Sequence, residues 1–537
     1  MNRFARFRLS MVLAGLALAA ASSDVAAAGA RPGKLKGDEQ SHMAASGTHL
    51  RLIVSPRDQT GGRLLPEQSA FFNITLRNEG SEAVRAFALD GNDTSPVFRV
   101  YDHNGNVLVE ATHSTLIDRF GADMGEPIPQ EPILVGLGPG EAATTFVDLW
   151  SYTDPLPKGR YEFGAAHRVG AGSGDWIESN RLAFDVVDAV VSEAVLGYEN
   201  VRRDSSLTVW VAQPEGKDQP QLLARLSAIG NQATAQRSGR ALGPVAPGSR
   251  VAIGGKPPEG TPTDEGWFAV AGPGSVEVIQ HFRTNPQWRS GPFEVPFANP
   301  HPVPGFPDRR HAVALFWGER QDGVTYLAGF VVSAREGVKT QWTLPLASPP
   351  SLIACLFSET GPIALLLATG GNQGVQLSRI DIDEAGKIVA AERIVRSSPD
   401  QLLAVAVDQR PEQPQMFYAL EGEARRPDHL TLVRIPLAGE PRTHDFGAVP
   451  GWPVSEGRPE RATRLDFTVG WDGIARLALL DRRGDYFAGP LDGSPLLQVA
   501  DAVHGPRVAL PLVAALRGDL SYSGFTGEGH LVYLGGR

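Results

Sequence analysis

The chain has 537 residues, of which 42% are hydrophobic and 20% charged, and its formal net charge is −10. This composition predicts a folded protein rather than a disordered chain, and the length predicts more than one domain. No block of basic residues offsets the negative charge, which argues against a nucleic-acid partner, because such binding depends on neutralising phosphates with Lys and Arg.

The first thirty residues have the layout of an export signal. Three arginines occur among the first eight residues, residues 9–21 are mostly apolar, and small residues allow cleavage after Ala27 or Ala30. The apolar stretch is shorter than the ~20 residues of a spanning helix. We therefore predict a Sec-type signal peptide over 1–30, a flexible leader over 31–48, and a periplasmic or extracellular protein without a transmembrane segment after cleavage.

The sequence contains one cysteine, Cys355, so no intramolecular disulfide is expected. Exported proteins of this size often carry disulfides in eukaryotes, and a disulfide-free exported chain rich in Ala, Arg, Gly and Pro is typical of bacteria. Cys355 lies in an apolar run, where we expect a small buried hydrophobic residue rather than a reactive thiol.

Residues 49–188 have the pattern of a β-sandwich. Turn residues separate short β-type runs every ~8–12 residues, and Phe72, Ile74 and Leu76 alternate on one face. An Asn-Gly pair within Asp102–Asn106 predicts a hairpin, because that turn requires positive φ. The expected strands are Leu50–Val54, Ala70–Arg77, Val97–Tyr101, Val107–Glu110, Thr144–Trp150, Arg160–Ala166 and Asn180–Val187.

The turns of this region resemble those of the immunoglobulin-like modules in many secreted bacterial proteins. The resemblance rests on the segments NITLRNEGSEAV, LGPGEAATTFVDL, LPKGRYEF and SNRLAFDVV. It implies an Ig-like β-sandwich and no particular function, since such modules share mainly their turn chemistry. The paired cysteines of antibody domains are absent.

From residue 193 to 537, short β-type runs recur every ~40–60 residues, which is the spacing of propeller blades. Residues 188–199 join the two regions, either as a linker or as the first strand of the second region. We expect the run His530–Leu534 to complete a blade begun near the start of this region, and so to close a ring. The recurring runs are Leu207–Ala212, Trp267–Gly272, Ala312–Trp317, Leu352–Phe357, Leu403–Asp408, Leu465–Gly470 and Val508–Val513.

This rhythm resembles that of the β-propeller superfamily. The resemblance implies an all-β protein with an N-terminal Ig-like β-sandwich plus a C-terminal β-propeller of seven blades, with six or eight as alternatives. No blade signature repeats, so it indicates no subfamily. Propellers host many functions, and the function has to be argued from a site.

Two acidic turns have oxygen-bearing side chains at alternate positions, as calcium loops do. In Asp102–Asn106 and Asp381–Gly386 the spacing does not match an EF-hand loop, and we expect two hairpin tips. The sequence also lacks the short zinc, phosphate-loop and nucleophile-elbow motifs. We predict no metal site and no cofactor.

Two long Pro-rich connections, residues 283–311 and 440–464, are the candidate binding loops, because connections of this length are often functional. Their aromatic residues can stack on sugar rings or hold a peptide, and paired arginines can bind a carboxylate or phosphate. The alternative is that the aromatics only anchor the loops to the ring. The predicted ligand-binding residues are Trp288, His301, Arg309, Arg310 and Trp452.

These observations favour an exported, non-catalytic binding or scaffold protein that presents propeller loops to a polymer, carbohydrate or protein partner. The alternative is a propeller glycan hydrolase or lyase, which would use paired carboxylates at the central channel. The sequence does not choose between the candidate acids, which are Asp408, Asp466, Asp472 and Asp481.

Overall fold

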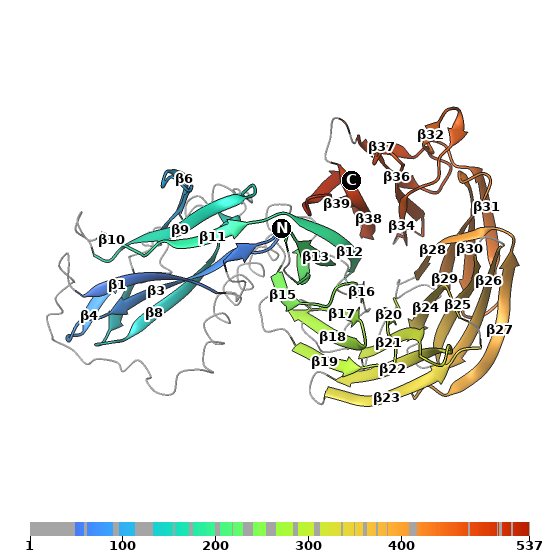
Figure 1. Ribbon diagram of the computed structural model, residues 1–537, viewed down its shortest axis with the longest axis horizontal. Coiled ribbons are helices and arrows are strands. Elements are labelled where there is room, and N and C mark those ends of the chain that lie inside the picture. The colour runs from blue at the N-terminus through green and yellow to red at the C-terminus, as the bar shows by residue number, and fades with distance from the viewer. Residues whose placement is uncertain are drawn as a thin grey trace, which may run out of the picture.

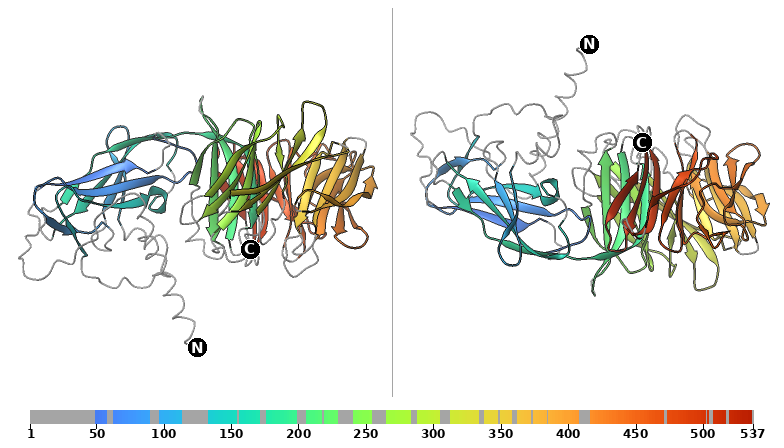
Figure 2. Two further views of the ribbon diagram at one scale, coloured as in Figure 1. Left: turned by 90° about the horizontal axis from the view of Figure 1, so that it is seen from below. Right: turned by 90° about the horizontal axis from the view of Figure 1, so that it is seen from above.

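A computed structural model describes residues 49–535 of the protein, apart from 58–61, 90–95, 113–132, 154–155, 171–175, 199–204, 217–218, 229–239, 254–264, 283–287, 305–311, 334–336, 348, 358–361, 372–373, 384, 408–415, 471–472, 502, 504–506 and 517–518. The described residues form an all-β protein with two bodies (Figure 1). Figure 2 shows the second body edge-on, with its sheets standing side by side and the N-terminal body beside it. The predicted signal peptide and leader lie outside the described residues.

The N-terminal body consists of sheets around one apolar core. Phe72 and Phe163, from two different sheets, stack with their ring centroids 4.2 Å apart. Phe72, Ile74 and Leu76 are all buried, as their alternation predicted. In hydrogen-bonding order the strands are β1 (Leu50–Pro56), β3 (Phe71–Asn78) and β8 (Ala142–Asp148); β2 (Arg63–Leu64), β11 (Leu182–Val186), β9 (Gly159–Arg168), β5 (Val97–Tyr101) and β6 (Val107–Ala111), with β10 (Trp176–Glu178) on β9; and β4 (Val84–Phe87) with β7 (Leu134–Leu137).

Each strand expected over residues 49–188 is present within a few residues of its predicted bounds, and a 3₁₀ turn at Leu149–Ser151 follows β8. The sequence did not reveal β2, β4, β7 and β10. These strands are only two to four residues long, so no alternation can be read from them.

The acidic turn at Asp102 is a hairpin tip, as predicted. Asp102 Oδ1 accepts hydrogen bonds from the backbone N–H groups of Asn104 and Asn106, each at 2.8 Å. Gly105 supplies the positive φ, +83°, that the turn needs. Asp383 has the same role in the second acidic turn, between β26 (Gly374–Ile382) and β27 (Ile388–Ser398).

The second body contains seven consecutive antiparallel sheets within the described residues, which we call sheets 1 to 7 in chain order. Each follows the chain strand by strand, and the arrangement is propeller-like (Figure 1). Sheet 1 is β12 (Ala189–Tyr198), β13 (Ser205–Pro214), β14 (Gln221–Ala228) and β15 (Arg240–Pro244); sheet 2 is β16 (Arg250–Ile253), β17 (Glu265–Gly272), β18 (Ser275–Phe282) and β19 (Trp288–Glu294); sheet 3 is β20 (His301–Pro302), β21 (Ala312–Glu319), β22 (Thr325–Ser333) and β23 (Gly337–Pro345); sheet 4 is β24 (Leu352–Phe357), β25 (Ile363–Gly371), β26 (Gly374–Ile382) and β27 (Ile388–Ser398); sheet 5 is β28 (Gln401–Val407), β29 (Met416–Gly422), β30 (His429–Pro436) and β31 (Arg442–Ala448); sheet 6 is β34 (Arg464–Val469), β35 (Ala475–Leu480), β36 (Tyr486–Pro490) and β37 (Leu497–Ala500); sheet 7 is β38 (Val508–Leu516), β39 (Asp519–Thr526) and β40 (Leu531–Gly535).

Each of the seven recurring runs lies in a different one of these sheets. In sheets 1 to 3 the run is the second strand, and in sheets 4 to 7 it is the first strand. The join at residues 188–199 contains β12, the first strand of sheet 1, which decides between the two alternatives left open by the sequence.

Two predictions about this region are wrong. The long connections are not loops: residues 283–311 include β19 and β20, and residues 440–464 include β31 and the small hairpin of β32 (Val454–Ser455) and β33 (Arg458–Pro459). The run at His530–Leu534 does not join sheet 1, because β40 pairs with β39 inside sheet 7.

Side-chain packing joins each sheet to the next. Seven apolar clusters each contain residues from two neighbouring sheets, and one of them joins sheet 7 to sheet 1. In that last cluster the ring centroids of Trp210 on β13 and Phe525 on β39 are 5.4 Å apart. Cys355 is buried between sheets 3 and 4, and burial raises the pKa of its thiol, as expected for a structural cysteine.

The N-terminal body contributes to this junction between sheets 7 and 1, which we call the seam. Leu65 is a member of the same apolar cluster. Glu67, which follows β2 with φ +62° and is 8% exposed, lies 3.7 Å from Arg225 of β14 and accepts a hydrogen bond from the backbone N–H of Leu531 at 3.3 Å. His530 Nδ1 is 3.9 Å from the same carboxylate. One side chain of the N-terminal body therefore contacts both the first and the last sheet.

Candidate functional site

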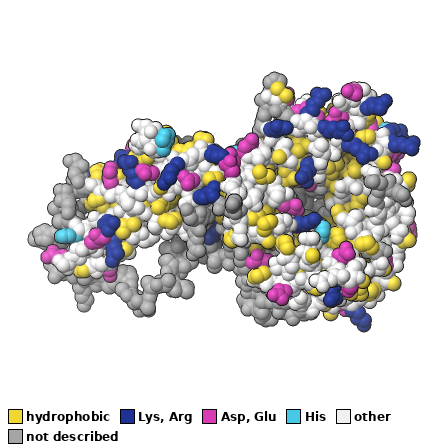
Figure 3. Space-filling model, in the orientation of Figure 1, with side chains coloured by type: hydrophobic (Ala, Val, Ile, Leu, Met, Phe, Trp, Pro, Cys, Tyr) yellow, Lys and Arg dark blue, Asp and Glu magenta, His cyan; other side chains and the backbone are white. Residues whose placement is uncertain are grey.

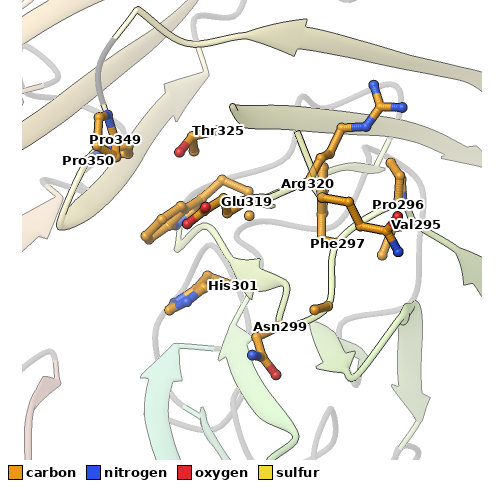
Figure 4. A pocket seen from close by; sticks show the side chains of 14 residues that line it. Val295, Pro296, Phe297, Asn299, His301, Glu319, Arg320, Thr325, Pro349 and Pro350 are labelled. Atoms are coloured by element: carbon orange, nitrogen blue, oxygen red, sulfur yellow. The ribbon is translucent and has the colours of Figure 1, made fainter. Parts of the chain in front are cut away.

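A pocket of about 730 Å³ lies at one end of sheet 3, where the connection from β19 to β20 meets the turn between β21 and β22 (Figure 4). Its lining combines apolar residues with amides, a carboxylate and a histidine, a mixture typical of small-ligand sites. The lining residues are Val295, Pro296, Phe297, Ala298, Asn299, His301, Trp317, Gly318, Glu319, Arg320, Gln321, Thr325, Pro349 and Pro350.

The central feature of the pocket is a stacked pair of rings. His301 and Trp317 are directly opposite each other on β20 and β21. Their ring centroids are 4.2 Å apart and their planes differ by 19°. The strand register thus fixes a flat aromatic surface at the pocket wall, because opposed residues on one face of a sheet lie within side-chain contact.

Arg250, on β16 of sheet 2, lies against the His301 ring and approaches Nε2 at 3.2 Å. Partial burial and, second, the charge of Arg250 lower the pKa of His301 to about 4. His301 is therefore neutral at pH 7, so its ring stacks and hydrogen-bonds without adding a second positive charge beside Arg250.

The floor of the pocket is formed where Gly318 and Phe297 approach each other closely. Phe297 is almost completely buried, and a Cβ at Gly318 would lie 2.8 Å from the Cβ of Phe297. Only glycine allows this contact. The aromatic side chain of Phe297 therefore anchors the connection between sheets 2 and 3, which is the anchoring role that the sequence left as an alternative for such residues.

Polar groups surround the stacked rings. In Figure 4 the side chains of Glu319, Thr325 and His301 gather on one side of the pocket, near Pro349 and Pro350. The Arg320 guanidinium points away from them, and its Cζ lies 4.8 Å from the centroid of Tyr326. The open side of the pocket thus offers a carboxylate and a hydroxyl beside an aromatic surface.

Of the five predicted binding residues, His301 is the one that the structure places in the pocket. Trp288 is on β19, where its backbone pairs with Gln280. Arg309 and Arg310 lie outside the described residues. The structure therefore brings together one predicted residue with neighbours that the sequence did not single out.

Trp452 is placed as a loop anchor. Its side chain is 6% exposed and belongs to the apolar cluster between sheets 5 and 6. Its indole N–H donates to the backbone carbonyl of Glu460 at 2.7 Å. This burial leaves neither a ring face nor a donor for a ligand, so we do not include Trp452 in the candidate site.

Of the four candidate acids of the enzyme alternative, two lie among the described residues, and both accept hydrogen bonds from backbone N–H groups. Asp466 accepts hydrogen bonds from the backbone N–H groups of Val513 and Phe467, at 2.7 and 3.0 Å, and burial raises its pKa to about 6. Asp481 accepts from the backbone of Arg483 in the turn between β35 and β36. Asp408 and Asp472 lie outside the described residues. Among the described residues no group of three or more His, Cys, Asp or Glu could hold a metal ion.

The sequence contained one signal from which Trp317, which was not among the predicted binding residues, could have been found. Trp317 ends the run Ala312–Trp317, which the periodicity assigned to the core, yet its side chain is only partly buried. A bulky aromatic at the end of a buried strand, next to the turn-forming segment 318–323, is placed at the rim of a sheet. Its position opposite His301 follows only from the pairing of β20 with β21.

Comparisons with known proteins add a likeness of architecture. No family model matches the chain, and no curated protein matches it. The structure is similar to the SapL1 lectin solved with alpha methyl fucoside (11% identity, TM-score 0.34, covering 58% of this chain and 96% of that one). It is also similar to the six-bladed lectin of Aleuria aurantia (12% identity, TM-score 0.34, covering 53% of this chain and 91% of that one). A third similar structure is the acylaminoacyl peptidase of Pyrococcus horikoshii (9% identity, TM-score 0.34, covering 64% of this chain and 52% of that one). The chain spans about half the length of that peptidase. With TM-scores of 0.34, these likenesses carry no argument about this chain, and the function has to be argued from the site.

Within the described part of the chain, no helix has the length and apolar character needed to cross a bilayer.

Proposed function

We propose that this protein is an exported, non-catalytic binding protein that holds a saccharide in the pocket of sheet 3. In this proposal residues 1–30 are a Sec-type signal peptide that directs the chain to the periplasm or the exterior. Residues 49–188 form an Ig-like β-sandwich, and residues 193–537 form a seven-bladed β-propeller that carries the site.

The seven-bladed arrangement is supported by the order of the interfaces. Each sheet shares an apolar cluster with the next, and the cluster that contains Trp210 and Phe525 joins the last sheet to the first. First strands of neighbouring sheets also contact one another, with β12 against both β16 and β38. A row of separate sandwiches would leave the faces of sheets 1 and 7 unpaired.

A saccharide ligand is proposed because of one observation, the stacked pair of His301 and Trp317 at the wall of a pocket that also carries polar groups. A sugar ring has apolar C–H faces that pack on an aromatic ring and a rim of hydroxyls that need partners. Glu319 and Thr325 offer acceptors, and Asn299 and Gln321 offer both donors and acceptors.

Binding is preferred to catalysis because the described acids do not form a catalytic pair. A glycosidase needs two carboxyl groups about 5 to 10 Å apart across the scissile bond. Asp466 accepts hydrogen bonds from the backbone N–H groups of Phe467 and Val513, and Asp481 accepts from the backbone of its own turn. Glu319 is the carboxylate that lines the pocket.

The test is a glycan array on the purified exported chain, followed by calorimetric titration of each saccharide retained. We expect Trp317→Ala to weaken binding by about fivefold or more, since an aromatic contact of this kind is worth about 1 kcal/mol or more. The matched control is Trp176→Ala, which removes an exposed tryptophan from the N-terminal body and should leave the affinity unchanged.

Asn299→Ala provides a second variant, because its exposed side chain can be removed without disturbing the core. Circular dichroism would establish that each variant is folded. If no saccharide is retained, or if folded Trp317→Ala and Asn299→Ala bind as the wild type does, the proposal is wrong. Retention of a protein or peptide in place of any saccharide would also overturn it.

A further inference from the structure

A second group of polar side chains lies next to the pocket, where first strands of different sheets meet. Glu193 is on β12, at a bulge that interrupts the pairing with β13. Its side chain is partly buried, and its carboxylate lies near the backbone of Val251 on β16. A bulge in an inner strand re-aims a side chain and is common beside functional sites.

Two arginines act on this carboxylate from different sheets. Arg250 on β16 and Arg464 on β34 both interact electrostatically with Glu193, although the two arginines belong to sheets 2 and 6. Figure 3 shows a hollow in the middle of this body, with side chains of both charges and a histidine at its edge. The sequence gives no hint of this group, because its members are distributed over much of the second region.

The group carries more positive than negative charge. Among the residues that the structure describes, neither Arg250 nor Arg464 has a carboxylate within ion-pair distance, and both guanidiniums are exposed. The hydrogen-bonding contact of Arg250 that the described residues show is with the ring of His301. Two guanidiniums around one partly buried carboxylate leave donors available for a further anion.

The arginine group and the pocket are continuous through His301. One face of this ring stacks on Trp317 inside the pocket, and its edge contacts Arg250. A sugar ring lying on the aromatic pair can therefore place a substituent beside Arg250. Because the net charge of the chain is −10, attraction for an anionic ligand has to come from such a local group.

We propose that the ligand is an acidic saccharide, whose carboxylate is bound by Arg250 and Arg464 while its ring rests on His301 and Trp317. This inference rests on the proposed saccharide site and specifies its ligand class. A carboxylate suits the site because the planar guanidinium fork pairs with two carboxylate oxygens at once.

The experiment uses three oligosaccharides of equal length. The first contains uronic acids, the second is the same chain with its carboxyl groups reduced to alcohols, and the third carries sulfate groups but no carboxyl groups. Affinities are measured by calorimetry for the full exported chain and for Arg250→Gln, Arg464→Gln and the double variant. Arg442→Gln, which removes an exposed arginine from β31, is the matched control.

We expect the wild type to bind the uronic-acid ligand at least about tenfold more tightly than the reduced one, since one charged hydrogen bond is worth about 1.5 kcal/mol or more. The arginine variants should lose this preference, and Arg442→Gln should keep it. Added salt should weaken binding of the acidic ligand more than that of the neutral ligand.

The outcomes separate the two proposals. If Trp317→Ala abolishes binding of both oligosaccharides but the arginine variants change nothing, the saccharide site stands and the acidic-ligand inference fails. If the sulfated ligand binds as tightly as the uronic-acid ligand, the site is a general anion site and the carboxylate assignment is wrong. If none of the three binds, both proposals fail.

Discussion

The seam between sheets 7 and 1 should depend on a single carboxylate of the N-terminal body. Glu67 contacts Arg225 of sheet 1 and the backbone of Leu531 in sheet 7. Glu67→Gln keeps the size of the side chain and an acceptor for Leu531, but it removes the charge that faces Arg225. The variant therefore isolates the electrostatic part of the contact.

The loss can be worked out from the geometry. At 3.7 Å and an effective dielectric constant of about 20, two opposite unit charges attract by about 4 kcal/mol. Arg225 is only 4% exposed, so water cannot replace the missing carboxylate. Removing one partner of a buried ion pair costs about 3 to 5 kcal/mol, and we expect the free energy of unfolding to fall by about 3 kcal/mol.

The assay is urea unfolding of the whole chain, followed by tryptophan fluorescence because Trp210 is buried at the seam. Glu79→Gln is the matched control: it breaks an exposed ion pair with Arg51 and should cost less than about 1 kcal/mol. A Glu67→Gln variant within about 1 kcal/mol of the wild type would refute the reasoning.

His530 gives an independent readout of the same contact. The carboxylate of Glu67, which is 3.9 Å from Nδ1, raises the pKa of His530 above its ordinary value. A raised histidine pKa contributes stability below pH 6.5, and this contribution is lost as the pH rises through the folded-state pKa. In Glu67→Gln the pKa measured by NMR should fall, and a pKa that does not move would show that the two side chains do not interact.

Two further predictions concern the pocket floor and the buried acid. Gly318→Val should displace Phe297, which would lower the free energy of unfolding by about 1 to 3 kcal/mol and weaken saccharide binding. The control Gly136→Val, where a Cβ meets nothing within 4 Å, should change neither the stability nor the binding. Equal effects of the two variants in calorimetry would contradict the packing argument. Because the pKa of Asp466 is raised to about 6, the folded state binds the proton more tightly, and this group should reduce stability as the pH rises from about 4 to about 6. Asp466→Asn should remove that part of the pH dependence in urea unfolding, and an unchanged slope would show that the buried carboxyl titrates normally.

Much of the strand pattern could be predicted from the sequence, because buried strands carry the clearest apolar signal. The run Leu352–Phe357 coincides with β24, and each of the other six recurring runs also lies in its own sheet. The outer strands β19 and β31 were mistaken for loops. They pair along one edge only, β19 contains a proline, and β31 is largely exposed, so neither has an apolar alternation.

The candidate site was predictable only in part. His301 was selected because it lies in a Pro-rich segment, but its position on β20 opposite Trp317 depends on strand pairing. Trp452 was selected by the same reasoning and is buried, because an aromatic in a connection is equally suited to anchoring it. Residue type and local composition do not separate these two cases, whereas exposure and register do.

The arginine group depends on the same packing that joins the sheets. Glu193, Arg250 and Arg464 belong to sheets 1, 2 and 6, so the path between them around the body crosses the seam. β40 stays within sheet 7 instead of pairing with sheet 1, and among the described residues no strand is shared by these two sheets. On this side of the body, the relative position of Arg250 and Arg464 depends on the packing of Trp210 on Phe525 and on the contact of Glu67 with both sheets. A carboxylate held by both arginines would add a further link across the same junction, and a ligand that binds only the folded state stabilises it by mass action. Under the acidic-ligand proposal, the N-terminal body therefore influences the arginine group without touching the ligand, because it contacts the sheets on both sides of the seam.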